Sequence, residues 1–124
     1  MRVQAPAADS ATIARLLQLT VDNPKLALFF HEKEIPARAP LVIVLGDSLR
    51  GSYDVSKFGR PVTFKTSTAL AKDEPFLEVT SIAVGGDTGR IAFRYPPEGI
   101  SGTMNFLRRP GEGWAVATTD IVEK

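Results

Sequence analysis

The sequence predicts a single α+β domain, with one or two N-terminal helices packed on an antiparallel sheet that ends in a four-strand meander. Two observations carry this prediction: apolar residues recur at helical spacing near the N-terminus, and they alternate with polar residues in the last fifty positions. The 124-residue length fits one domain. We expect residues 9–124 to form it, and the Ala- and Pro-rich residues 1–8 to be a linker or a disordered N-terminus.

The first predicted helix covers residues 9–21. Its apolar and small side chains, Ile13, Leu16, Leu17 and Thr20, fall on one face at helical spacing. Such a stripe is typical of a helix that lies on a sheet.

The next segment, residues 24–34, has two interpretations. Asn23 followed by Pro24 is typical of an N-cap and a first helical residue, and we favour a short helix. The stretch "LALFFH" also suits a strand, because aromatic residues are common in sheets, so the strand alternative stays open.

Two strands are predicted in the middle of the chain. Residues 41–45, "LVIVL", form a short β-branched run between a proline and a glycine, which indicates a strand buried on both faces. Residues 61–66 alternate and predict a second strand. Residues 46–60 are rich in Gly, Ser and Asp and predict a loop, and residues 67–75 predict a connector with one helical turn.

The meander is predicted by four alternating segments joined by short turns. These segments are residues 76–84, 90–95, 100–109 and 114–122. Short turns join neighbouring antiparallel strands, so the four strands should lie side by side in chain order.

The C-terminal third, residues 79–116, carries a resemblance to a known superfamily. It reads "VTSIAVGGDTGRIAFRYPPEGISGTMNFLRRPGEGWAV": a strand, a Gly-Asp turn, an alternating strand and a hairpin that ends in a Gly-Trp-x-Val strand. This pattern resembles the nuclear-transport-factor-like (cystatin-like) superfamily. The resemblance implies a curved sheet wrapped around helices, often with a cone-shaped pocket. It implies no single activity, because enzymes, binding domains and dimerisation modules share that scaffold.

A second, shorter resemblance concerns residues 46–49. Gly-Asp-Ser-Leu after an apolar strand resembles the first block of the GDSL hydrolase family, in which the serine is the nucleophile. That family supplies its base from an Asp-x-x-His block near the C-terminus. Here the single histidine, His31, precedes Ser48, and Asp120 has no histidine three residues later. We therefore interpret Asp47 and Ser48 as turn residues, and His31, Asp47 and Ser48 remain the only catalytic candidates.

Composition excludes several classes of function. Fifteen basic and fourteen acidic residues leave a net charge of +1, so we expect no nucleic-acid partner. The absence of cysteine excludes disulfides and thiolate sites, and a single histidine among carboxylates is a poor metal set, so we expect no metal and no cofactor. No apolar run approaches the ~20 residues that cross a bilayer. The N-terminal composition suits a spacer after a removed signal, which favours a periplasmic or exported protein over a cytoplasmic one.

The candidate binding residues are Arg90, Arg94, Tyr95 and Trp114. The two arginines share the outward face of one predicted strand, and the two aromatic residues are large and amphipathic. The leading hypothesis is a non-enzymatic binding domain that engages a protein partner, as an inhibitor, an immunity-type protein or a secretion-accessory protein. The alternative is a nuclear-transport-factor-like pocket protein that binds or turns over a small apolar molecule. A homodimer through an unpaired edge strand also stays open.

Overall fold

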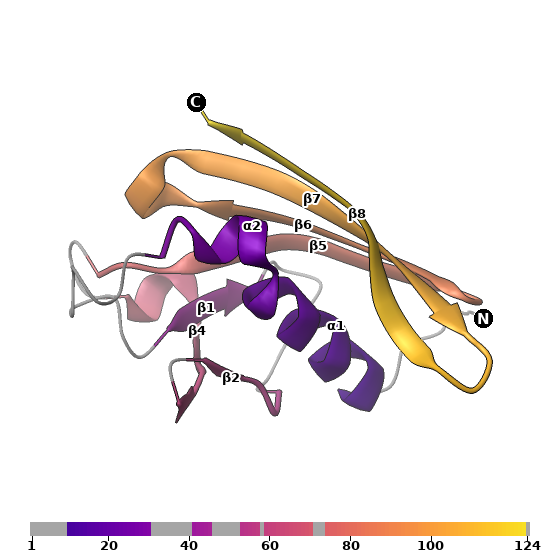
Figure 1. Cartoon of the computed structure of the whole chain (residues 1–124). Helices are drawn as coiled ribbons and strands as arrows, with labels where there is room; N and C mark the ends of the chain where they lie inside the picture. Colours follow the sequence, from indigo (N-terminus) through magenta and orange to yellow (C-terminus); the bar gives the residue numbers. More distant parts are fainter. Residues whose placement is uncertain (1–9, 31–40, 46–52, 58, 71–73, 124) are drawn as a thin grey trace, which may run out of the picture.

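The computed structural model describes residues 10–30, 41–45, 53–57, 59–70 and 74–123. Within them the chain forms one main helix and a six-stranded mixed sheet, with a separate two-stranded hairpin (Figure 1). The predicted α+β class is therefore confirmed.

The main helix, α1 (Ser10–Asp22), confirms the first predicted helix almost residue for residue. Leu16 and Leu17 are fully buried, and so is Thr20, whose hydroxyl donates to the Leu16 carbonyl oxygen at 2.8 Å. This back-bond satisfies the one polar side chain on the buried stripe.

A second, four-residue helix, α2 (Pro24–Ala27), follows directly. The Oδ1 atom of Asn23 accepts a hydrogen bond from the Lys25 N–H at 2.9 Å, which is the N-cap that the Asn-Pro pair predicts. Residues 28–30 continue as a turn, so the helical interpretation is right for this part of the segment. Residues 31–34 lie outside the described residues.

The large sheet has the strand order β4-β1-β5-β6-β7-β8. The strands of both sheets are β1 (Val42–Leu45), β2 (Ser56–Lys57), β3 (Arg60–Pro61), β4 (Thr63–Lys65), β5 (Leu77–Gly85), β6 (Thr88–Tyr95), β7 (Ile100–Arg109) and β8 (Gly113–Glu123). The prediction of a purely antiparallel sheet is wrong, because β1 runs parallel to both β4 and β5. The long connection between β1 and β4 permits this arrangement, whereas short turns permit only antiparallel neighbours.

An unpredicted hairpin spans the end of the predicted loop over residues 46–60 and the first residue of the next predicted strand. Strands β2 and β3 pair through Ser56↔Pro61 and Lys57↔Arg60. The Gln18 side chain on α1 holds β2, since its Nε2 donates to the Ser56 carbonyl and its Oε1 accepts from the Ser56 N–H, both at 2.9 Å. The strands of this hairpin are too short to show an alternation of apolar and polar residues. The hairpin is held by its contact with α1, which the sequence pattern does not indicate.

The C-terminal meander, β5 to β8, is confirmed: each predicted strand is present and each pairs antiparallel with the next. The strand predicted over residues 61–66 is confirmed as β4, and the predicted helical turn is present at Ser67–Ala69. At the β5–β6 turn Gly86 has φ +58°, a conformation that favours glycine.

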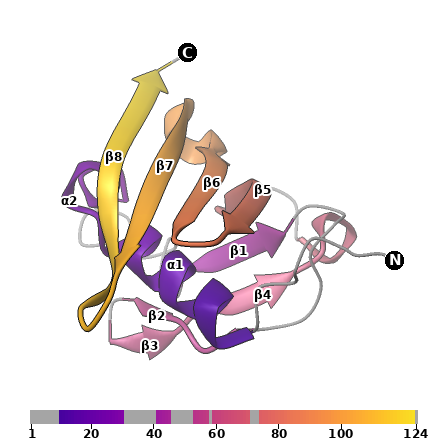
Figure 2. The same ribbon diagram turned by 90° about the vertical axis from the view of Figure 1, so that its right-hand side faces the viewer.

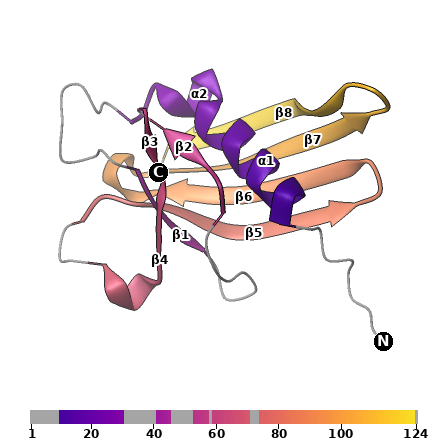
Figure 3. The same ribbon diagram turned by 90° about the horizontal axis from the view of Figure 1, so that it is seen from below.

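The core lies between α1 and one face of the sheet, which we call the inner face. In Figures 2 and 3 the sheet wraps around α1, from β8 on one side to β4 on the other. Phe93, Tyr95, Met104 and Phe106 all point to the inner face and are at most 2% exposed. The ring of Phe30 packs edge-on against Tyr95 with centroids 5.3 Å apart. Helix and meander therefore share one continuous hydrophobic core.

Candidate binding surface

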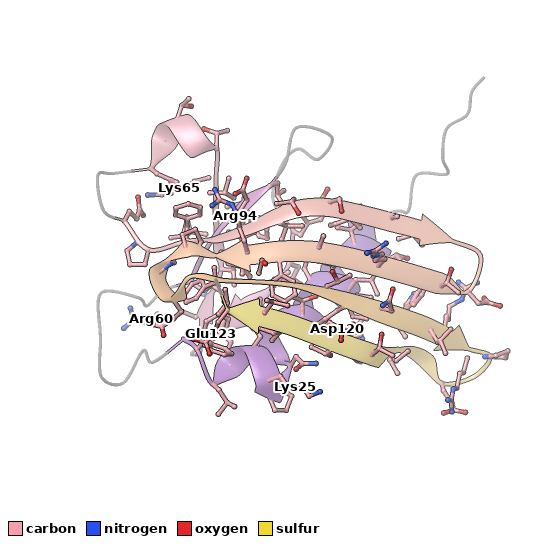
Figure 4. All side chains as sticks on the ribbon, turned by 90° about the horizontal axis from the view of Figure 1, so that it is seen from above. Lys25, Arg60, Lys65, Arg94, Asp120 and Glu123 are labelled. Carbon is pink, nitrogen blue, oxygen red and sulfur yellow. The ribbon has the colours of Figure 1, made fainter. Side chains whose placement is uncertain are left out.

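The opposite side of the meander is open in the part of the chain that the structure describes. No described helix lies over it, and Figure 4 looks directly onto it. We call this surface the outer face. Strand register arranges its side chains in three rows across β5, β6, β7 and β8. The rows are Glu78–Arg94–Ser101–Val122, Ser81–Ala92–Thr103–Asp120 and Ala83–Arg90–Asn105–Thr118.

Four of the twelve positions in these rows are charged. Arg94 on β6 forms an ion pair with Glu78 on β5. Among the described residues, the side chains of Arg90 and Asp120 have neither an ion-pair nor a hydrogen-bond partner. Two arginines and two acidic residues therefore leave the face without net charge, and its remaining positions are mostly small or uncharged polar side chains.

A shallow hollow of about 370 Å³ lies at the centre of the outer face. Ala92, Thr103 and Asp120, the middle row, line it together with their neighbours. Beneath it, Gly102 is so tightly enclosed that an added Cβ atom would lie 2.6 Å from the Asp120 carbonyl oxygen and 2.7 Å from the Phe93 ring. The close approach of three strands at Gly102 thus holds the floor of the hollow in place.

The four predicted binding residues do not form one surface. Arg90 and Arg94 lie on the outer face, as their alternation indicates. Tyr95 is 1% exposed and belongs to the inner face. Trp114 is half-buried at the start of β8, with the Arg108 guanidinium 5.6 Å from its ring centroid.

A second hollow, of about 410 Å³, lies at the hairpin tips beside Arg108. Arg108 donates to the Asp87 carboxylate at 3.0 and 3.1 Å, and its backbone N–H donates to the Asp87 carbonyl at 2.7 Å. These bonds tie the β5–β6 turn to the end of β7. Two of the three charged residues that line this hollow, Asp87 and Arg108, are thus engaged with one another in a contact that is structural.

Two lysines are likewise paired. Lys65 contacts Glu74 at 2.7 Å, and Lys57 contacts Asp22 at 3.6 Å. Figure 4 shows Lys65 well away from Asp120, near the other edge of the sheet.

Asp120 is the outer-face residue that sequence reasoning missed as a binding candidate. Strict alternation from Trp114 places Asp120 on the same side as Trp114. In the structure Ala117 is an extra residue in β8, because Asn105 pairs with Thr118 while Phe106 pairs with Val116. This bulge reverses the alternation and turns Asp120 outward.

The predicted catalytic candidates, His31, Asp47 and Ser48, lie outside the described residues. Within the described ranges, no group of three or more histidine, aspartate or glutamate residues is placed to hold a metal ion. No helix in the described part of the chain is long and apolar enough to cross a membrane.

Comparisons of the chain with protein-family models, with curated proteins and with solved structures find no match. The geometry of the outer face is therefore the ground for a functional proposal.

Proposed function

We propose that the chain is a non-enzymatic binding domain that contacts a protein partner through the outer face of its meander. The observation that supports this most directly is the composition of that face. The twelve positions of its three rows include two arginines and no lysine, and protein interfaces are enriched in arginine and depleted in lysine relative to the rest of the surface.

The size of the outer face suits a protein partner. Four strands about 4.8 Å apart and eight residues long cover roughly 500 Å². An interface of that area on each of two partners reaches the ~1,000 Å² at which specific protein contacts begin. Two apolar side chains add to it, since Val122 is 59% exposed and Leu107, in the next row along β7, is 41% exposed.

The packing of the aromatic residues favours this proposal over the small-molecule alternative. A pocket on the inner face would be lined by the large side chains of Phe93, Tyr95, Met104 and Phe106, and these pack in the core with α1 and Phe30. Packing in the core explains why these side chains are large and apolar, without a bound ligand. The inhibitor, immunity-type and secretion-accessory classes, and the exported location, stay predictions.

The proposal is tested by blocking the middle row. Ala92→Arg places a long charged side chain at the centre of the outer face, and Ala11→Arg makes the same change at an exposed position on α1. Proteins retained on immobilised wild-type chain from a lysate of the source cells should be lost with Ala92→Arg and kept with Ala11→Arg. Retention that is identical for all three chains would contradict a role for the outer face.

A further inference from the structure

We propose that the partner of the outer face is a second copy of this chain, packed face to face about a two-fold axis that runs along β7. This inference rests on the proposed function, because it takes the outer face as the binding surface. It names the occupant of that surface and the contacts that select it.

The positions of the two unpaired charges are the first observation. Arg90 lies on β6 and Asp120 lies on β8, so β7 separates them. Asp120 is in the same row as Ala92, one row from Arg90. The two residues therefore stand on opposite sides of β7, and within one chain they form no ion pair.

A two-fold axis along β7 brings these charges together. The rotation exchanges the β6 and β8 positions within each row, so Asp120 of the second copy lies above Ala92. Same-face neighbours on a strand are about 6.8 Å apart, and packed sheets are about 10 Å apart, which is within reach of an arginine side chain. Arg90 of each copy then meets Asp120 of the other. Because the contact is isologous, it forms twice.

The remaining outer-face residues fit the same axis. Along β7, Ser101, Thr103 and Asn105 lie on the axis, where each faces its own counterpart across the interface. These side chains are short, and Ala92 leaves open the space that Asp120 of the second copy enters. Val122 of one copy lies above Arg94 of the other, so it covers the aliphatic part of that side chain. Sheets that pack face to face keep their strand directions within about 30° of each other, and an axis along β7 meets this condition.

Charge complementarity favours a second copy over other occupants. A strongly acidic or basic partner would leave one of the two unpaired charges facing a like charge, which is unfavourable. A second copy satisfies both charges with no other molecule. The buried area, roughly 1,000 Å² in total, is at the low end for a specific interface, so we expect dissociation constants in the micromolar range.

The test is a charge exchange measured by sedimentation velocity on the purified full chain. Protein concentrations from about 1 μM to 1 mM bracket a micromolar equilibrium. The wild-type chain should change from monomer to dimer over this range. Arg90→Glu and Asp120→Arg should each weaken the dimer at least about tenfold, because each places like charges opposite one another. The double variant should return the affinity to within about threefold of wild type, because the exchanged pair is again complementary.

Matched controls make the same charge changes away from the outer face. Arg15→Glu on α1 and Glu112→Arg at the β7–β8 turn alter two exposed residues, and the dimer should form as in wild type. Thermal melting of each variant at low concentration verifies folding, so that a lost dimer is not confused with a lost fold.

Three outcomes would overturn the inference. One is a chain that stays monomeric at every concentration. Another is a dimer that both single variants leave intact, which is the result expected if the dimer forms through the β8 edge instead. The third is a folded double variant that stays as weak as the singles. A monomeric chain that still captures a different protein through Ala92 would overturn only the second copy, and the proposed function would stand.

Discussion

Replacing Gly102 with alanine should destabilise the domain, because the structure has no space for a methyl group at that position. The added Cβ would lie 2.6 Å from the Asp120 carbonyl oxygen and 2.7 Å from the Cζ atom of Phe93. The Phe93 ring is buried and cannot retreat without displacing the core, and the carbonyl belongs to a paired strand. Overpacking of this kind costs about 2–3 kcal/mol, toward the upper end of its usual range because one of the two contacts is backbone.

The assay is urea unfolding at a low protein concentration, followed by the fluorescence of Trp114, the one tryptophan of the chain. A loss of 2–3 kcal/mol corresponds to a fall of roughly 5–15 °C in melting temperature for a domain of this size. Gly85→Ala is the matched control, since an added Cβ there meets nothing within 4 Å. That change should leave stability unaltered or raise it by up to about 1 kcal/mol, through a smaller unfolded-state entropy. Equal stabilities for the two variants would refute the packing of Phe93 on Gly102.

Three further predictions concern the helices and the outer ion pair. Leu16→Ala should lower the free energy of unfolding by about 2–5 kcal/mol, because the side chain is fully buried; a loss below about 1 kcal/mol in urea titration would contradict its place in the core. Asn23→Ala should cost about 1–2 kcal/mol, and Asn23→Asp should recover the cap but not the hydrogen bond that Asn23 donates to the Thr119 hydroxyl at 3.0 Å. If the aspartate variant melts no higher than the alanine variant, the cap is not the stabilising contact. Glu78→Gln should cost less than about 1 kcal/mol, since the pair with Arg94 is solvent-accessible; a larger loss in the melt would show that the pair holds β5 and β6 together.

The elements that sequence predicts well are those whose pattern is local. The stripe of α1 and the alternation of β5 to β8 both follow from side-chain spacing within one element. The Asn23 cap and the glycine turns are likewise decided by neighbouring residues. For these parts, the residues of one element are enough to predict it, and no contact with the rest of the fold has to be known.

The errors arise where distant segments decide the structure. The parallel pairing of β1 with β4 and β5 joins segments that are distant in sequence, and "LVIVL" is compatible with either direction. The short β2–β3 hairpin depends on the Gln18 side chain, 38 residues from Ser56 in sequence. Neither contact leaves a periodic pattern in the sequence.

On the candidate surface too, some side-chain directions follow from the local sequence and others depend on strand pairing. The outward direction of Arg90 and Arg94 follows from the alternation of β6 and was predicted. The outward direction of Asp120 depends on the extra residue Ala117, which is visible only once β7 and β8 are paired. The same alternation of β6 places Tyr95 on the inner face with Ile91 and Phe93, where its ring packs against Phe30.

Only the inner face of the meander packs against α1, so the residues of the outer face are not determined by the packing of the core. Alternation requires that Ile91, Phe93 and Tyr95 be apolar, because they face α1, but it places no such demand on the residues between them. At those positions solubility alone would favour charged side chains, as on many exposed sheets. Two of the three β6 positions in the outer-face rows are arginines, but the position between them is Ala92, and Asp120 lies in the same row as Ala92 two strands away. Folding does not explain this arrangement, whereas a self-complementary interface accounts for both the small residue and the two opposite charges.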